Sequence, residues 1–568
     1  MTALHDLSAV ELLAAYRSRA LSPVEVTRAV LAHIAVWEPH LHATYALDGH
    51  KALAQAEASQ ARWLSGAPQG PLDGVPVMIK ENIATQGVPV PLGSAATELV
   101  PAPTDAPPAA RLREAGAVIL GKTTMPDYGM LSSGLSSFHA LTRNPWDLRL
   151  NPGGSSAGAA AGVAAGYGPL HVGTDIGGSV RLPAGWCGIV ALKPSQGRIP
   201  IHPPYAGRVA GPMTRTVEDA ALLMATLSLP DARDAMSLPY QPIEWQRLDR
   251  EIKGLRIGLL LDAGWGLAVE PEVRAAVVAA ARAFEGAGAI VTPLAPFTTR
   301  AMVDGIDDFW RTRAWLDIGV LPEARRAQVL PYITEWARGG AGLSGERVFR
   351  GYSMMGAMRD AAVSACQPFD MVFSPTAPIP AFAAELPGPT NDPAAPFEHI
   401  AFTLPFNMSE QPAANINCGT TASGLPIGLQ IVGRRFDDLG VLQVARMVLQ
   451  QAVPARAGLA PATVDRGPSR AQVAAFVGVG AGHQRLRFIE QLARQRHQVR
   501  LGEGEDEHRL DHPRQAPAGI RGDGGIERGE RVAVERHQVP QRALMVFARG
   551  GGRGSERQIA KLVHGAFR

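Results

Sequence analysis

The stretch GTDIGGSVR, at residues 173–181, places Ser179 directly behind two glycines. Glycine is favoured where the backbone needs unusual dihedral angles or where another group must approach the main chain closely. Successive exposed N–H groups in such a segment can bind developing negative charge. Two interpretations follow from these residues alone: a tight structural turn, or a serine exposed beside an oxyanion hole.

An oxyanion hole at this position would be built from main-chain N–H groups. The four candidates are those of Ile176, Gly177, Gly178 and Ser179. A donor aimed at the oxyanion of a tetrahedral intermediate typically lowers the barrier by about 2.7–4 kcal/mol. The main chain alone can therefore supply much of a rate enhancement in acyl transfer.

Short apolar runs alternate with helical patterns on both sides of this stretch. The strand-like runs include GVPVMIK at residues 74–80, GAVILGK at 116–122, PLHVGTD at 169–175 and GLPIGLQIVG at 424–433. The helical patterns include AARLREA at residues 109–115 and the Ala-rich AAAGVAAG at 159–166. Strands that alternate with helices indicate an α/β fold with a mixed sheet.

Two helices are predicted near the amino-terminal end, because each begins with a capping box. Ser8 is followed by Glu11, and Ser22 by Glu25, with Pro23 at the first helical position. In a capping box the serine and the glutamate satisfy N–H groups in the first turn of the helix. A third helix is predicted from about residue 51 to residue 64.

Composition and charge are those of an ordinary soluble protein. The 568 residues carry a formal net charge of +3, and 46% of them are hydrophobic. We find no leader pattern and no apolar run long enough to span a bilayer, so we expect a cytoplasmic protein without a membrane partner. Cys187, Cys366 and Cys418 lie far apart and no HExxH motif occurs, so we expect no disulfide framework, no metal and no cofactor.

The residues from Arg456 onward differ in composition from those before them. They hold 19 Arg and one Lys against 12 Asp and Glu, a net charge of +8, and they contain no Trp or Tyr. Few aromatic residues and a bias towards Gly and Arg favour disorder or a loose appendage. We therefore predict a folded domain at residues 1–455 and an Arg/Gly-rich tail at residues 456–568. The tail is either disordered or non-native in composition, as a shifted reading frame would make it.

The string GAVILGKT, at residues 116–123, matches the phosphate-loop pattern G-x-x-x-x-G-K-[ST]. That motif requires a loop after a strand, so that exposed N–H groups surround a phosphate. Here the four middle residues, Ala117 to Leu120, are themselves the expected strand. We therefore reject a nucleotide-binding site at this position.

A pair of serines, Ser155 and Ser156, also follows two glycines, upstream in NPGGSSAG at residues 151–158. Gly/Ser richness by itself is typical of a flexible turn. The spacing from Ser155 to Ser179, with an Ala-rich helix and a short strand between them, would also let the two loops face one another. The helix after Ser156 would then direct the positive end of its dipole at the serines.

A serine nucleophile needs a base, and Lys80 is the candidate. The chain has only six lysines beside 49 arginines, so lysine is not its usual surface cation. Lys80 ends the apolar run VPVMIK, where burial would favour the neutral amine that a base requires. His171 is the nearest histidine, and its strand-like surroundings favour a core or edge residue. From position alone, Lys80 fits a base and a structural side chain equally well.

Lys80, GGSSAG and GTDIGGSVR in this order and spacing resemble the amidase signature family, the Ser-cisSer-Lys amide hydrolases. The similarity continues through DGVPVMIKEN, LPAGWCGIVALKPSQGRIP and GLPIGLQIVGRRFDDLGVLQVA, and so covers about residues 5–452. It implies that residues 1–455 form a single large α/β domain, with a central mixed β-sheet covered by helices on both faces. It also implies hydrolysis of an amide C–N bond to a carboxylate plus ammonia or an amine.

The resemblance also implies roles for individual residues. Ser179 matches the nucleophile, Ser155 the bridging serine on a cis peptide after Gly154, and Lys80 the base. Lys80 would deprotonate Ser155 as Ser155 deprotonates Ser179, and the proton would return to the leaving amine before water hydrolyses the acyl-enzyme.

Three further positions match residues that surround this triad in the family: Ser156, Asp175 and Arg181. A structural ion pair and a capping hydroxyl explain these three equally well. Residues 309–352, which contain Trp and Arg, are expected to wall the substrate pocket.

One branch of the family is the A subunit of a glutamine-dependent aminoacyl-tRNA amidotransferase. In that branch an Asp that recognises glutamine precedes the Asn of a late PxN motif, whereas HIAFTLPFN at residues 399–407 contains no acid. This departure favours a free-standing amidase for a small aliphatic or aryl amide, and the amidotransferase component is the alternative. A second alternative is a non-catalytic binding protein whose Arg-rich tail binds nucleic acid.

The expected partner of the amidase is a small-molecule amide. The sequence is compatible with a homodimer and with a monomer. Nucleic acid is not expected as a partner.

Overall fold

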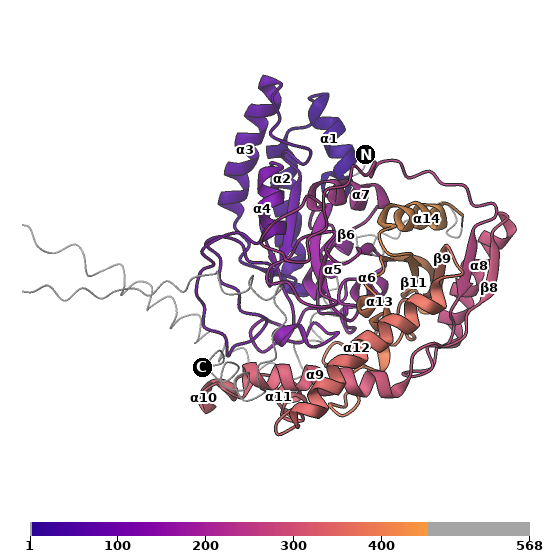
Figure 1. Cartoon of the computed structure of the whole chain (residues 1–568). Helices are drawn as coiled ribbons and strands as arrows, with labels where there is room; N and C mark the ends of the chain where they lie inside the picture. Colours follow the sequence, from indigo (N-terminus) through magenta and orange to yellow (C-terminus); the bar gives the residue numbers. More distant parts are fainter. Residues whose placement is uncertain (1–2, 452–568) are drawn as a thin grey trace, which may run out of the picture. The chain divides into compact units, whose positions relative to one another are not determined.

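The computed structural model describes residues 3–451 of the chain. The predicted tail at residues 456–568 and its boundary near residue 455 lie outside the described residues. Within those residues, eleven strands form one β-sheet, in the order β1-β3-β2-β4-β6-β5-β10-β11-β9-β7-β8 (Figure 1).

The strands are β1 (Thr44–Tyr45), β2 (Pro76–Lys80), β3 (Val118–Thr123), β4 (Leu170–Asp175), β5 (Val190–Lys193), β6 (Val209–Thr214), β7 (Arg256–Leu259), β8 (Ile290–Pro293), β9 (Met371–Pro375), β10 (Ala413–Thr420) and β11 (Pro426–Gly433). The α-helices are α1 (Ala9–Arg17), α2 (Pro23–Leu41), α3 (Gly49–Ser65), α4 (Pro107–Glu114), α5 (Ala157–Ala164), α6 (Arg181–Cys187), α7 (Val217–Leu227), α8 (Pro271–Gly286), α9 (Arg300–Ile318), α10 (Glu323–Arg326), α11 (Pro331–Arg338), α12 (Gly345–Cys366), α13 (Leu404–Met408) and α14 (Asp438–Gln451). Three short 3-10 helices are η1 (Leu4–Asp6), η2 (Asp127–Gly129) and η3 (Glu398–Ile400).

Strand pairing is parallel in two regions of the sheet. β2 lies between β3 and β4 and is parallel to both, and β7 lies between β8 and β9 and is parallel to both. The remaining neighbours pair in antiparallel fashion. The prediction of a mixed α/β sheet is therefore confirmed.

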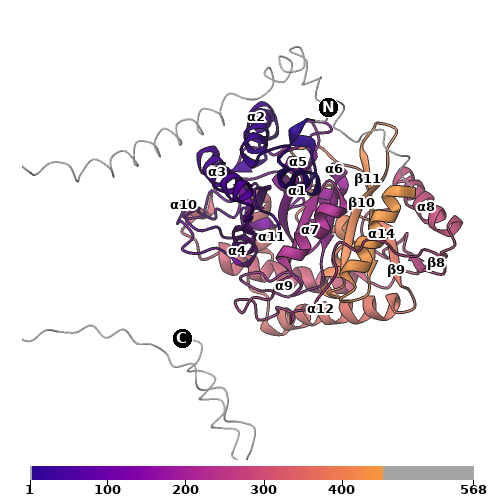
Figure 2. The ribbon, with the colours of Figure 1, turned by 90° about the horizontal axis from the view of Figure 1, so that it is seen from above.

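Helices cover both faces of the sheet. Successive side chains of a strand point to opposite faces, and in β9 Met371 and Phe373 enter one hydrophobic core while Val372 enters another. The first core includes Phe284 of α8, whose ring centroid lies 5.3 Å from that of Phe373. The second includes Met358 of α12, and α12 packs along α9 (Figure 2).

The helix starts predicted from capping residues are confirmed. Ser8 and Ser22 each accept a hydrogen bond from the N–H three residues later, and Glu11 and Glu25 complete the two capping boxes. The helix predicted from about residue 51 to residue 64 is α3, which extends over Gly49–Ser65. Local side-chain chemistry was therefore sufficient to place these three helices.

The rejected phosphate loop is a strand, as predicted. Residues Val118–Thr123 form β3, which pairs with β2 in the sheet, and the N–H of Ile119 donates to Gln55 Oε1 at 3.2 Å. Lys122 is buried, and its Nζ atom donates to the carbonyl of Ile83 and, at 2.7 Å, to Thr85 Oγ1. The lysine that would reach a phosphate in a true phosphate loop is thus engaged inside the protein.

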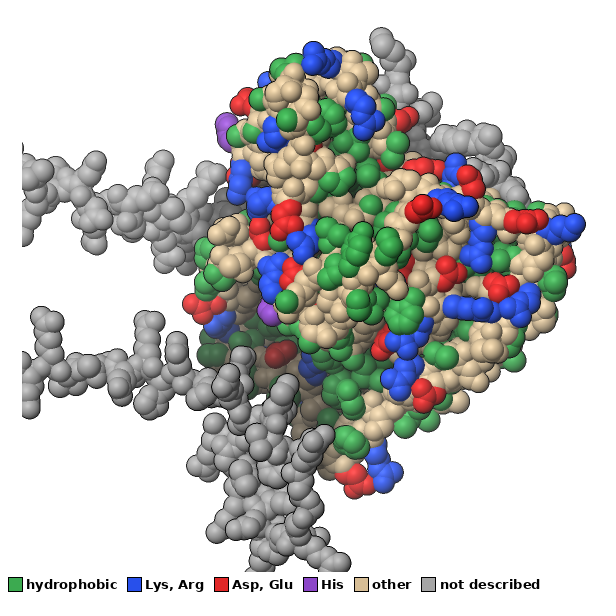
Figure 3. All heavy atoms as spheres, turned by 45° about the horizontal axis from the view of Figure 1, so that its top comes forward, with side chains coloured by type: hydrophobic (Ala, Val, Ile, Leu, Met, Phe, Trp, Pro, Cys, Tyr) green, Lys and Arg blue, Asp and Glu red, His purple; other side chains and the backbone are tan. Residues whose placement is uncertain are grey.

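On the face of the molecule that Figure 3 displays, the surface carries no large patch of a single sign of charge. Acidic and basic side chains lie interspersed there with apolar ones. Across residues 3–451, the helices all fall short of the length and apolar character that crossing a membrane requires.

Candidate active site

The carboxyl ends of β2 and β4 lie at the same edge of the sheet. The two strands are parallel neighbours, with Ile79 opposite Val172. Lys80 is the last residue of β2 and Asp175 the last residue of β4. Because parallel strands end together, the loop that carries Ser179 starts beside Lys80.

A second loop joins the first at this edge. Ser155 and Ser156 immediately precede α5, and the N–H of Ser156 donates to the carbonyl of Ser179 at 3.1 Å. The Gly154–Ser155 peptide bond is cis. The main chains of the two glycine-rich loops are therefore in direct contact, as their spacing in the sequence predicted.

Lys80 connects the two serines of the second loop. Its Nζ atom donates to Ser155 Oγ at 2.8 Å and to Ser156 Oγ at 3.1 Å. Ser156 was considered as a helix-capping hydroxyl, but it makes no capping bond to α5. Its hydroxyl instead donates to the carbonyl of Thr174 at 3.2 Å. The side chain of Ser156 therefore links Lys80 to the end of β4.

The environment of Lys80 favours the neutral amine. The side chain is fully buried. Burial lowers the pKa of Lys80 to about 7, and the positive charge of Arg208 acts in the same direction, whereas Asp175 and Glu81 oppose the shift. A group with a pKa near neutrality can accept a proton and return it at working pH.

Ser179 lies in the loop between β4 and α6 and is partly exposed to a cavity. Within the described residues, the N–H groups of Ile176, Gly177 and Ser179 have no hydrogen-bond partner. The N–H of Gly178 was expected as a fourth oxyanion donor, but it donates to Asp175 Oδ1 at 2.8 Å. A donor held by a buried carboxylate is not free for an oxyanion, so three of the four predicted donors remain.

Asp175 and Arg181 form a buried ion pair, with Arg181 Nη2 2.9 Å from Asp175 Oδ1. Although burial favours the neutral acid, Arg181 holds the pKa of Asp175 well below its usual range. Asn407 completes the group: its Nδ2 donates to Asp175 Oδ1 at 2.8 Å, and its Oδ1 accepts from Arg181 Nη2 at 2.6 Å. This network holds the main chain on both sides of Ser179, because Asp175 also accepts from the N–H of Val180.

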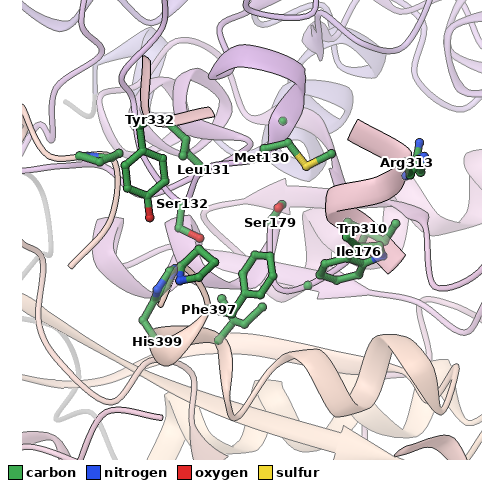
Figure 4. Close-up of a pocket in the computed structure, with 15 residues that line it drawn as sticks. Met130, Leu131, Ser132, Ile176, Ser179, Trp310, Arg313, Tyr332, Phe397 and His399 are labelled. Carbon is green, nitrogen blue, oxygen red and sulfur yellow. The ribbon is translucent and has the colours of Figure 1, made fainter. Parts of the chain in front are cut away.

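A cavity opens over Ser179. The cavity and its mouth enclose about 630 Å³ of non-atom space, with the open solvent at the mouth included. Its lining residues come from five parts of the chain: Gly129, Met130, Leu131, Ser132, Ile176, Gly177, Ser179, Trp310, Arg313, Tyr332, Pro387, Pro396, Phe397, His399 and Ile400. Figure 4 shows Ser179 between Arg313 on one side and Tyr332 and His399 on the other.

Trp310 of α9 and Tyr332 of α11 form part of the aromatic wall of the cavity and lie within the region expected at residues 309–352, whereas Phe397 precedes η3 and lies outside it. Trp310 and Phe397 meet edge to face, with centroids 5.4 Å apart. His399 is almost fully buried, and both of its ring nitrogens lack a hydrogen-bond partner among the described residues. Burial lowers the pKa of His399 to about 3, so the ring is neutral.

His171 does not take part in this site. It lies in β4 with its side chain fully buried, and its Nε2 atom is 3.2 Å from the carbonyl of Tyr167. Its interpretation as a core residue is therefore confirmed.

Several functional positions escaped the prediction from sequence. Asn407 lies 232 residues from the carboxylate it holds, and Phe397 reaches the cavity from outside the region expected at residues 309–352, whereas Arg313 lies inside that region. No local pattern marks these residues, because their partners are set by strand order and helix packing. The PxN motif alone drew attention to Asn407.

Comparison with known proteins agrees with this geometry. A family model described as Amidase matches residues 25–442. The A subunit of the glutamyl-tRNA(Gln) amidotransferase of Myxococcus xanthus (strain DK1622) is 36% identical over 476 residues, which cover 78% of this chain and 96% of that protein.

Solved structures with the same fold include amide hydrolases. A bacterial aryl acylamidase of the amidase signature enzymes matches with a TM-score of 0.73 and 29% identity, covering 79% of this chain and 97% of that chain. A 6-aminohexanoate cyclic dimer hydrolase matches with a TM-score of 0.72 and 26% identity, covering 80% of this chain and 98% of that chain.

Proposed function

We propose, since the chain belongs to the amidase family, that it hydrolyses the C–N bond of a small aliphatic or aryl carboxylic amide through a serine acyl-enzyme. Members of this family are amide C–N hydrolases. The proposal gives Ser179 the role of nucleophile, Ser155 that of proton relay and Lys80 that of base. No metal or cofactor has a part in it.

In the proposed reaction, neutral Lys80 accepts the proton of Ser155 while Ser155 accepts the proton of Ser179. Ser179 Oγ then attacks the amide carbonyl, and the oxyanion binds the free N–H groups of Ile176, Gly177 and Ser179. The proton returns through Ser155 to the leaving nitrogen as the C–N bond breaks. A water molecule then passes its proton to the same relay and attacks the carbonyl of the acyl-enzyme. The ester bond to Ser179 breaks, the carboxylate leaves, and the proton returns to Ser179 Oγ.

The hydrogen bond from Lys80 Nζ to Ser155 Oγ, at 2.8 Å, supports the proton relay. The pKa of about 7 for Lys80 supports its role as a base. The main-chain contact between Ser156 and Ser179 supports a short path for the proton. Lys80, Ser155 and Ser156 are all buried, so these contacts are shielded from bulk water.

The composition of the cavity is the observation that carries the choice of substrate class. Its described lining is mostly apolar and aromatic, and none of the lining residues is an Asp or a Glu. A free amino acid such as glutamine presents an ammonium group, which a buried site must pair with an acceptor. An amide without an ammonium group fits this lining better.

The A subunit of a glutamine-dependent aminoacyl-tRNA amidotransferase is a second candidate function. The observation in its favour is that the Myxococcus xanthus relative, which is 36% identical, bears that name. In that role the chain would release ammonia from glutamine for a partner protein. The segment HIAFTLPFN at residues 399–407, where that branch carries its glutamine-recognising Asp, contains no acid here. Its first two residues, His399 and Ile400, line the cavity.

Ammonia release by the purified protein alone separates the two candidates. The amides to test are aliphatic amides, anilides and glutamine, with the Ser179→Ala variant as the blank. We expect release from simple amides or anilides and none from glutamine. Release from glutamine alone would favour the amidotransferase role.

A further inference from the structure

Arg313 differs from the other arginines of its helix. α9 carries three arginines, and two of them form ion pairs at 2.6 Å: Arg300 with Glu398 and Arg311 with Asp307. Arg313 has no carboxylate partner within residues 3–451, although it is half-buried and lines the cavity over Ser179. A partly desolvated guanidinium without a counterion is a ready site for an anionic group of a ligand.

The orientation of Arg313 is held by an aromatic ring rather than by an acid. Its Cζ atom lies 4.0 Å from the centroid of the Tyr205 ring. A guanidinium held against an aromatic ring can still bind a carboxylate through those N–H groups that the tyrosine does not engage. Trp310, three residues earlier on α9, faces the same cavity, so the aromatic wall and Arg313 share one helix face.

A second arginine, Arg208, lies close enough to Arg313 for the two charges to interact, although it does not line the cavity. Arg208 lies in the turn closed by its N–H bond to the carbonyl of Tyr205, at 3.0 Å. Its Nη1 atom donates to the carbonyl of Pro203 at 2.9 Å, and it too has no ion-pair partner within residues 3–451. Burial and the like charge of Arg313 lower the pKa of Arg208 to about 10. Two neighbouring cations without an acid repel each other, and a bound anion would offset that repulsion.

We propose that Arg313 forms a carboxylate-binding end of the cavity, so that the preferred amides carry a negatively charged group. This inference rests on the proposed function, because it names the substrate class of the same site. The carboxylate belongs either to the acyl part or to the leaving group of the amide. Ser179 lies in the cavity with Arg313 to one side of it, so a single small molecule can reach both residues (Figure 4).

Two matched pairs of amides test the inference and distinguish the two positions of the charge. Succinamic acid is compared with butyramide for a charged acyl part, and 4-acetamidobenzoic acid with acetanilide for a charged leaving group. We expect kcat/KM of the wild-type protein to be at least about tenfold higher for the charged member of one pair, since a charge-assisted bond to arginine is worth about this much. Equal or lower values for the charged members of both pairs would overturn the inference.

The variant Arg313→Gln should reduce this preference about tenfold, mainly through KM. Arg313→Lys keeps the charge but loses the planar fork, so its preference should be intermediate. Arg338→Gln is the matched control, because Arg338 is exposed on α11 and does not line the cavity. If the ratio of kcat/KM between the charged and the neutral amide is the same in Arg313→Gln, in Arg313→Lys and in the wild type, another residue selects the charge. That result would overturn the inference.

Binding to the inactive Ser179→Ala variant separates this inference from the proposed function. Calorimetry should show tighter binding of the charged member of the favoured pair, and weaker binding when Arg313→Gln is added. If no amide is turned over but this difference persists, the proposed function fails and the anion site stands. If amides are turned over without any difference, the anion site fails and the proposed function stands.

Discussion

The Nζ atom of Lys80 lies 2.8 Å from the Oγ atom of Ser155, although the two residues are 75 positions apart in the sequence. The contact exists because β2 ends beside β4 and because the loop before α5 is bonded to the loop after β4. A buried amine in contact with a hydroxyl is the arrangement that a lysine base requires. This edge of the sheet therefore holds both groups through which the proposed relay would pass its proton.

Activity should depend on the ionisation of Lys80. Its pKa lies near 7 in the folded protein, so the amine is protonated and inactive as a base below that pH. We expect kcat/KM to rise with pH through an ionisation near 7 and to level off above about pH 8. The pH profile of kcat/KM with a neutral anilide measures this directly.

The variant Lys80→Arg should lose nearly all activity, by a factor of about 10³ or more, because a guanidinium keeps the charge but offers no lone pair at working pH. Lys80→Met should be as inactive as Lys80→Arg. Near-normal turnover of the arginine variant would show that Lys80 supplies only positive charge.

Replacement of Ser179 by alanine should abolish labelling by a fluorophosphonate probe and reduce turnover by about 10³-fold or more. The far-ultraviolet circular dichroism should stay the same, since one partly exposed hydroxyl contributes little to packing. Ser155→Ala should be strongly slowed but retain residual turnover, because the free main-chain donors remain. Persistent labelling of Ser179→Ala would place the nucleophile elsewhere.

Lys80→Met should stabilise the protein while it inactivates it. The pKa of Lys80 falls from 10.5 to about 7 on folding. Below pH 7 the folded protein therefore carries the full cost of a buried ammonium, and this cost decreases as the pH rises towards 10.5. We expect the melting temperature of Lys80→Met to exceed that of the wild type by about 2 °C or more at pH 6, and by less at pH 9. A larger gain at pH 9 than at pH 6 would contradict the assignment.

Asn407→Ala should destabilise the protein and impair catalysis together. The substitution removes one hydrogen bond from each member of a buried ion pair, and a third from the carbonyl of Gly207. The expected cost is about 2 kcal/mol or more, together with a lower kcat. Urea denaturation and steady-state kinetics measure the two effects. Gln328→Ala, which alters an exposed amide, is the matched control and should change neither quantity.

A chain that ends at Pro454 should keep full activity. This prediction rests on the change of composition after residue 455, because the residues concerned lie outside the described ones. Turnover of a neutral amide and the melting temperature are to be compared with those of the full chain. Loss of either would show that the Arg/Gly-rich segment belongs to the folded domain.

Elements with a local signal could be predicted from the sequence alone. The capping boxes at Ser8 and Ser22 placed two helices, and the β-branched run before Lys122 identified a strand where a motif match suggested a phosphate loop. The candidate triad came from the resemblance of Lys80, GGSSAG and GTDIGGSVR to the amidase signature family, because the residues by themselves left each role open. For the helices and the strand, the chemistry that sets the structure lies within a few residues of the chain.

The pairing of polar groups could not be predicted in this way, even over the three positions that separate Asp175 from Gly178. The N–H of Gly178 looks free in the sequence, and only the fold places the carboxylate of Asp175 where it accepts that bond. Asn407 and Arg313 carry no local mark of their roles either.

The sequence by itself determined the α/β class, the family resemblance and the side chains available for catalysis, because these depend on periodicity, turn chemistry and short spacings. The tertiary structure decided which polar groups are paired inside the protein and which are left for a ligand. Gly178 is engaged, the N–H groups of Ile176, Gly177 and Ser179 are free within the described residues, and Arg313 faces the cavity without an acid there. The physical reason is that hydrogen bonds and burial depend on strand order and helix packing, which join segments more than 200 residues apart.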